Sequence, residues 1–130
     1  MFPQEHIPDQ DAVFYRVHKD LLKSGPQPHP GCFRETPAGS GELSVDWSKY
    51  STPVQTRAGG AASPESYGIL ELEVAKIRQI ENLAVIHDPQ AGNRAHTAVR
   101  GLGTTKSELR TMQRALLLDA CGERWKIAPG

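Results

Sequence analysis

The chain has 130 residues, of which 38% are hydrophobic and 23% are charged, and its fifteen basic residues balance fifteen acidic ones. This composition predicts one soluble globular domain with its own core, and the balanced charge excludes strong non-specific attraction to nucleic acid or to an anionic membrane. No segment approaches the roughly 20 apolar residues of a membrane span. The two cysteines form no CxxC pair and the five histidines show no ligand spacing, so we expect a cytoplasmic protein with no metal site and no cofactor.

The N-terminal residues 1–11 are polar and contain two prolines, which predicts a flexible arm. They lack the basic segment and apolar core of a signal peptide, so we expect none. We expect a single α+β domain over residues 12–122 and a C-terminal tail over residues 123–130.

Five segments have the pattern of β-strands. In AVFYRVH, residues 12–18, Val13, Tyr15 and Val17 alternate with Phe14, Arg16 and His18, as expected for a strand with one apolar side. Similar patterns or short apolar runs predict four more strands: ELSVDW (42–47), GILELEV (68–74), LAVIH (83–87) and AHTAVRG (95–101).

The connections between these strands differ in character. KDLLKSG (19–25) predicts one or two helical turns, and AKIRQIENL (75–83) predicts a short helix. Residues 25–41 contain four prolines and four glycines, which predicts a long surface loop. Residues 52–67 are expected to form a second irregular stretch.

Residues 104–122 predict a long C-terminal helix. Thr105 and Glu108 have the spacing of a capping box, and Gly122 suits the position beyond the end. Helical spacing predicts a buried face and, opposite it, a solvated basic stripe of Lys106, Arg110 and Arg114. The buried face would consist of Leu109, Met112, Leu116, Leu117 and Ala120. Together, the elements predict an α+β fold in which an antiparallel or mixed sheet of four to five strands carries this helix on one face.

The order of several short motifs resembles that of a group of small bacterial proteins of unknown function. The matching residues are Arg16 and His18, Leu43–Asp46, Asp88–Pro89, Asn93 and Ala95–His96. The resemblance implies an intact domain from a bacterium and implies no particular chemistry. By analogy with such proteins, the setting would be a bacterial toxin, antitoxin or defence system.

Strand alternation also suggests a candidate site. It places Arg16 beside His18, His96 beside Arg100, and Ser44 beside Asp46, and neighbouring strands would bring them together on the sheet face away from the helix. Two guanidinium groups and two imidazoles suit a phosphate or carboxylate ligand. The alternative is an ordinary polar sheet face with cross-strand pairs, such as Arg16 with Glu71 or Asp46.

Two functions therefore stay open. The first is a binding or interaction module that contacts a protein partner or a small anionic ligand through Arg16, Arg100, Ser44 and Asp46 and the long loops. The second is a small enzyme that acts on a nucleotide or phosphoester, with His18 and His96 as the catalytic candidates for proton transfer. No GxSxG nucleophile motif occurs. We expect neither a membrane nor a nucleic-acid partner, and a homodimer is left open.

Overall fold

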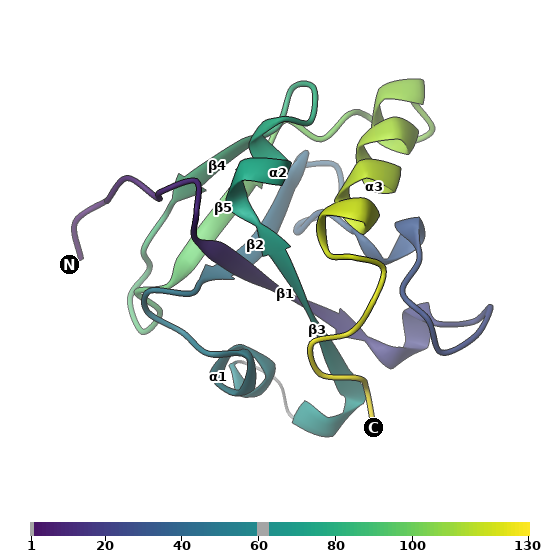
Figure 1. The fold of residues 1–130 in the computed structure, drawn as a ribbon, viewed down its shortest axis with the longest axis horizontal. Helices are drawn as coiled ribbons and strands as arrows, with labels where there is room; N and C mark the ends of the chain where they lie inside the picture. The colour runs from purple at the N-terminus through teal and green to yellow at the C-terminus, as the bar shows by residue number, and fades with distance from the viewer. Residues whose placement is uncertain (1, 60–62) are drawn as a thin grey trace.

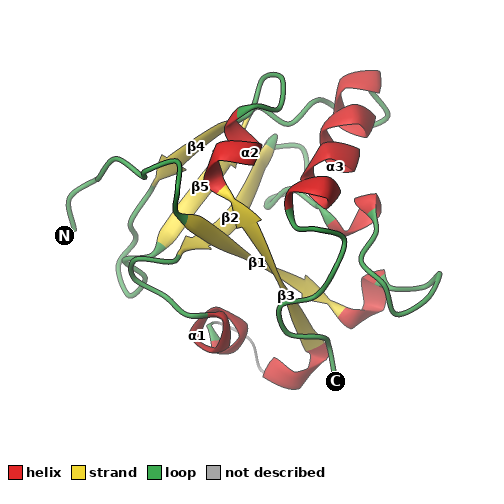
Figure 2. Ribbon diagram, viewed as in Figure 1, coloured by secondary structure: helices red, strands yellow, loops and turns green. Residues whose placement is uncertain are grey.

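The computed structural model describes residues 2–59 and 63–130, which form a five-stranded sheet with helices packed against it (Figures 1 and 2). The strands are β1 (Ala12–His18), β2 (Glu42–Trp47), β3 (Tyr67–Glu73), β4 (Ala84–His87) and β5 (His96–Arg100). The α-helices are α1 (Pro53–Ala58), α2 (Val74–Arg78) and α3 (Glu108–Ala120). Short 3-10 helices are η1 (Lys19–Leu21), η2 (Pro30–Cys32) and η3 (Pro64–Ser66). The predicted α+β fold and its long C-terminal helix are confirmed.

The strand order is β3-β1-β2-β5-β4, and all neighbouring strands are antiparallel. Phe14, Asp46 and His96 lie in one row across β1, β2 and β5. The register between β1 and β2 covers only the pairs Val13–Trp47 and Phe14–Asp46. Farther along β2, the amide of Thr36 donates to the carbonyl of Glu42 (2.9 Å). This bond closes the loop before β2 against the first residue of that strand.

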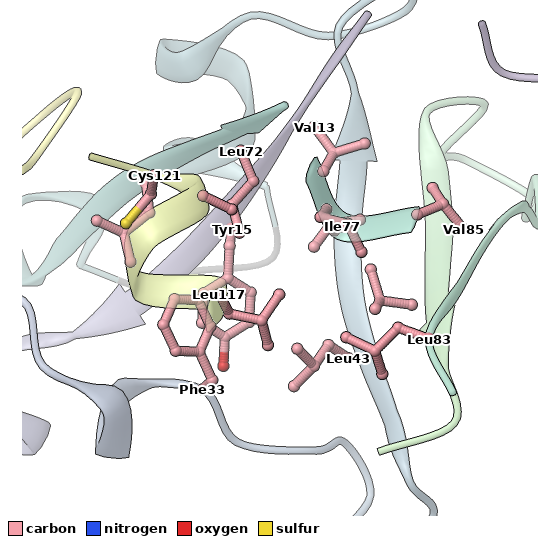
Figure 3. Close-up of a cluster of buried hydrophobic side chains, with 14 of the residues drawn as sticks. Val13, Tyr15, Phe33, Leu43, Leu72, Ile77, Leu83, Val85, Leu117 and Cys121 are labelled. Carbon is pink, nitrogen blue, oxygen red and sulfur yellow. The ribbon is translucent and has the colours of Figure 1, made fainter. Parts of the chain in front are cut away.

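The hydrophobic core lies on one face of the sheet, beneath α2 and α3. Leu117 and Cys121 from the end of α3 and Ile77 from α2 are buried there with side chains of β1, β2 and β3, as Figure 3 shows. Tyr15 stacks on Phe33 at 5.4 Å between ring centroids. Its hydroxyl donates to the carbonyl of Cys32 (3.0 Å) and accepts from the amide of Arg34 (2.9 Å). The predicted loop 25–41 is thus anchored to the core by an aromatic side chain of β1.

Helix α3 begins later and is rotated relative to the prediction. Its N-cap is Ser107, whose hydroxyl accepts from the amide of Arg110, so the capping box expected at Thr105 is wrong. Leu117 and Ala120 are buried as predicted, whereas Leu116 is 39% exposed. Arg110 points inward and pairs with Glu35, so the predicted solvated stripe is wrong at this residue, whereas Lys106 is exposed as predicted. The rotation occurs because polar groups beneath the helix pair with its inward-facing polar residues.

Gln113 shows this pairing at the centre of α3. Its side chain is fully buried, and its Nε2 donates to the carbonyls of Glu81 (3.0 Å) and Gly101 (2.9 Å). Its Oε1 accepts from the amide of Gly103 (2.8 Å). The buried amide is therefore fully hydrogen-bonded, and it links α3 to the backbone of two loops.

The segment 52–67, expected to be irregular, contains α1 and η3. Thr52 and Gln55 form a reciprocal capping box at the start of α1. Each side chain accepts a hydrogen bond from the backbone N–H of the other residue, which the helix itself leaves without an acceptor. Arg16 of β1 donates from Nη1 to the carbonyls of Thr56 (2.8 Å) and Gly59. These bonds hold α1 on the polar face of the sheet, opposite α2 and α3.

Both terminal segments contact the sheet edges. The expected arm packs beside β4: Ile7 is buried, and the amide of Glu5 donates to Nδ1 of His87 (2.9 Å). The C-terminal tail forms a bridge with the outer edge of β3 through Ile69 and Ile127. Each edge strand is thereby covered by a nearby segment, which removes exposed backbone groups from the sheet margin.

Candidate functional site

A cavity of about 650 Å³ lies on the polar face of the sheet, where β1 and β2 stop pairing. It is open to solvent on one side, and α1, the segment after β2 and the 88–95 turn surround it. Among the described residues its polar lining comprises Arg16, Thr36, Ser44, Asp46, Tyr50, Ser51, Gln55, Thr56 and Asn93. The sequence predicted three of these as site residues, namely Arg16, Ser44 and Asp46.

The cavity owes its position to two features of the fold. Strand alternation turns Phe14, Ser44 and Asp46 toward this face. The Arg16 guanidinium then fixes α1 at the rim through two backbone carbonyls. Phe14 is buried at 4% exposure and contributes an apolar patch to the lining. The cavity thus combines an aromatic ring with polar groups, as small-molecule sites commonly do.

Asp46 is the acidic group of this cavity. Its Oδ1 accepts from the side-chain amide of Asn93 at 3.0 Å, so the 88–95 turn orients the carboxylate. Ser44 and Thr36 place hydroxyl groups in the same lining. Carboxylate and hydroxyl oxygens accept hydrogen bonds from ligand hydroxyl or amine groups. Arg16 is the one arginine among the described lining residues, so the charges of Arg16 and Asp46 balance there.

His96 lies next to the cavity and connects Ser44 to Asp88. Its Nδ1 is 2.9 Å from the carbonyl oxygen and 3.3 Å from Oδ2 of Asp88. Because a carbonyl can only accept, Nδ1 carries a proton, and in the neutral form of the ring Nε2 is then an acceptor. The Ser44 hydroxyl lies 3.4 Å from Nε2. Ser44, His96 and Asp88 therefore form one line of side-chain contacts in space. No nucleophile motif in the sequence indicates this arrangement.

The other predicted residues lie apart from His96. The ring of His18 accepts from the amide of Asp20 (3.1 Å) and caps η1. Arg100 forms an exposed ion pair with Glu42 (2.7 Å). In the described part of the chain, no hydrogen bond or ion pair joins any two of Arg16, His18, His96 and Arg100.

Charged groups of the N-terminal segment border the cavity through Tyr50. The hydroxyl of Tyr50 and the ammonium of Lys49 both donate to the carboxylate of Glu5. These bonds, the one from Lys49 foremost, lower the pKa of Glu5 below its ordinary value. Arg94 also stacks on the Tyr50 ring at 4.2 Å. Tyr50 is therefore held in place by ionic and aromatic contacts that single-sequence patterns did not predict.

Across residues 2–59 and 63–130, no group of three or more His, Cys, Asp or Glu side chains is arranged to hold a metal ion. In that same portion, none of the helices has the length and apolar character needed to cross a membrane. Comparisons with models of protein families, with curated proteins and with solved structures found no match to this chain.

Proposed function

We propose that the protein is a binding module that takes a small polar ligand in the cavity on the sheet face. The observation that carries the proposal is the lining itself, in which Asp46, Ser44 and Arg16 come from two strands and share one hollow of about 650 Å³. That volume lies within the range of small-molecule sites.

The lining favours a ligand that donates hydrogen bonds. Asp46 offers carboxylate oxygens, and Ser44, Thr36 and Ser51 offer hydroxyls. The balance of one carboxylate and one guanidinium favours a neutral or zwitterionic molecule with hydroxyl or amine groups. Apolar parts of that ligand would lie against Phe14. A cytoplasmic location belongs to this proposal, because Cys32 and Cys121 are both free thiols, as is usual in reducing compartments.

The test is a ¹⁵N NMR screen of the whole chain with sugars, polyols and amino acids at millimolar concentration. We expect at least one of these classes to shift the amide signals of Ser44, Asp46 and Asn93, and Asp46→Asn to abolish the response. Arg100→Gln is the matched control, because its exposed ion pair lies outside the cavity lining. Absence of any response in the three classes, or an unchanged response in Asp46→Asn, would contradict the proposal.

A second function is favoured by the alignment of Ser44, His96 and Asp88. In it, the Ser44 hydroxyl attacks an ester carbonyl in the cavity, and Nε2 of His96 takes the hydroxyl proton. The ester C–O bond breaks and the alcohol leaves with that proton, after which water hydrolyses the acyl-serine to the free acid. We place this second because Ser44 belongs to the cavity lining and His96 does not. Covalent labelling with a fluorophosphonate reagent tests it. Labelling of the native chain that is lost in both Ser44→Ala and His96→Ala supports hydrolysis, and no labelling contradicts it.

A further inference from the structure

Three arginines gather around a second hollow, which lies between the start of α3 and the loop that precedes β2. The hollow has a volume of about 350 Å³, and Arg34, Arg110 and Arg114 line it together with Glu35, Gly39 and Thr105. Arg34 comes from the loop after η2, and the other two arginines come from successive turns of α3. This arginine cluster is separate from the sheet-face cavity, with which it shares no described lining residue.

The negative charge in the arginine cluster is already engaged. Oε1 of Glu35 accepts from Nη1 of Arg110 at 2.6 Å, and Oε2 accepts from the amide of Gly41 at 2.9 Å. Both carboxylate oxygens therefore have protein donors. Three guanidinium groups against one carboxylate leave an excess of two positive charges around the hollow. Arginine keeps its charge at any pH at which the protein is folded.

Two donors of the arginine cluster have no partner. The Nε atoms of Arg110 and Arg114 are buried, and neither donates a hydrogen bond to any described protein atom. Arg114 also has no ion-pair partner among the described residues. Burial, with Arg110 and Arg34 nearby, lowers the pKa of Arg114. Arg114 is half-buried, so its guanidinium places a positive charge beside the hollow that no described protein anion pairs with, and that charge is available to a bound anion.

We propose that the arginine cluster binds a small dianionic oxyanion, namely inorganic phosphate or the phosphate group of a phosphomonoester. A dianion neutralises the excess of two charges, and its oxygens can accept from the guanidinium donors in the paired geometry that arginine provides. The hydroxyl of Thr105, which accepts from Nη1 of Arg110 (3.2 Å), can donate its own proton to the same anion.

The size of the hollow limits the ligand. A volume of about 350 Å³ accommodates a phosphate with a short organic substituent and is at the lower limit for small-molecule sites. Inorganic phosphate and a small phosphomonoester such as glycerol 3-phosphate share the chemistry. Their relative affinities show which of the two is the ligand, because tighter binding of the ester means that the organic substituent is also bound.

The experiment is isothermal titration calorimetry of the whole chain with phosphate, glycerol 3-phosphate and sulfate at low ionic strength. We expect saturable binding, which Arg114→Met and Arg34→Gln each weaken at least tenfold. Arg100→Met, which removes an exposed arginine outside the cluster, should leave the affinity unchanged. Arg114→Met should remain folded, since it removes a half-buried charge that has no ion-pair partner among the described residues, and thermal melting without added anion checks this.

The pH dependence provides a second criterion. The second pKa of a phosphate monoester is about 6, so the affinity for glycerol 3-phosphate should fall several-fold between pH 7.5 and pH 5.5. Sulfate keeps two negative charges over that range, and its affinity should not change. Glu35 stays ionised there, because the Gly41 amide and Arg110 lower its pKa. Absence of binding, or equal affinities in the native chain and Arg114→Met, would overturn the proposal.

Discussion

Glu35 and Arg110 form a buried ion pair in which Oε1 and Nη1 are 2.6 Å apart and the side chains are 6% and 11% exposed. The pair joins the loop after η2 to the first turns of α3. It turns a helix face that would otherwise point to solvent toward the protein interior. Both the rotation of α3 and the arginine cluster depend on this contact.

Removal of one partner of this pair should be strongly destabilising. Arg110→Met leaves the Glu35 carboxylate buried without its cation, which should lower the free energy of unfolding by about 3 kcal/mol. Urea denaturation measures the change. The double variant Glu35→Met/Arg110→Met should recover part of the loss, since no unpaired charge then remains. A loss below about 0.5 kcal/mol in the single variant would be typical of an exposed pair and would contradict the assignment.

The pair should also contribute to acid denaturation. The hydrogen bond from the Gly41 amide, followed by that from Arg110, lowers the pKa of Glu35 below 4.5. The native state therefore favours the ionised form, and this stabilisation is present above pH 4.5 and is lost as the pH falls through the lower native pKa. Glu35→Gln should have a shallower acid dependence of stability, measured by urea denaturation between pH 6 and about pH 3. Glu42→Gln, from the exposed pair with Arg100, is the control and should keep the native slope.

Tyr15 should make the protein sensitive to alkali. Burial raises the pKa of Tyr15 from 10.0 to about 12, so the native state favours the neutral phenol. Its contribution is complete below pH 10 and is lost as the pH rises toward 12. Tyr15→Phe should remove this alkaline loss. It should also cost about 1–2 kcal/mol at neutral pH, because the Arg34 amide loses its acceptor. Chemical denaturation at pH 8 and pH 11 separates the two effects.

His87 should have a structural role that its place before a turn does not indicate. The ring is 1% exposed, accepts from the Glu5 amide (2.9 Å) and lies with Nε2 2.7 Å from the carbonyl of Arg94. His87→Ala should lower the free energy of unfolding by about 2–4 kcal/mol. It should also speed hydrogen exchange at Glu5, measured by NMR. His18→Ala removes a half-exposed ring and should cost less than about 1 kcal/mol; equal losses in the two variants would refute the distinction.

Gly101 should tolerate no side chain. Its φ is +102°, and a Cβ there would collide with the carbonyl oxygen of Asn82. Gly101→Ala should cost more than about 3 kcal/mol, from backbone strain and steric overlap together. Gly92 has a φ of +82°, and a Cβ there would meet nothing within 4 Å, so Gly92→Ala should show the strain alone, about 1 kcal/mol. Thermal melting of the two variants compares them, and similar melting temperatures would contradict the packing at Gly101.

Local patterns predicted the strands because the two-residue period of a strand depends only on neighbouring residues. The alternation in β1 and β2 placed Arg16, Ser44 and Asp46 on the polar face, and the structure brings these three into one cavity. The sequence also contained a local signal for α1. Thr52, directly before the helix, and Gln55, in its first turn, have the spacing of a capping box. The many glycine and proline residues around it favoured an irregular stretch, so the helix was not predicted.

The tertiary structure decided which polar side chains meet. Periodicity could not show that Glu35 would pair with an inward-facing Arg110, or that Gln113 would bond to two loops, because each partner lies at least ten residues away along the chain. The same holds for the approach of Ser44 to His96 across β2 and β5. Sequence determines the period and polarity of each element through local contacts. The rotation of α3, and therefore the arginine cluster, results from the pairing of buried charges, which is decided only when distant segments pack.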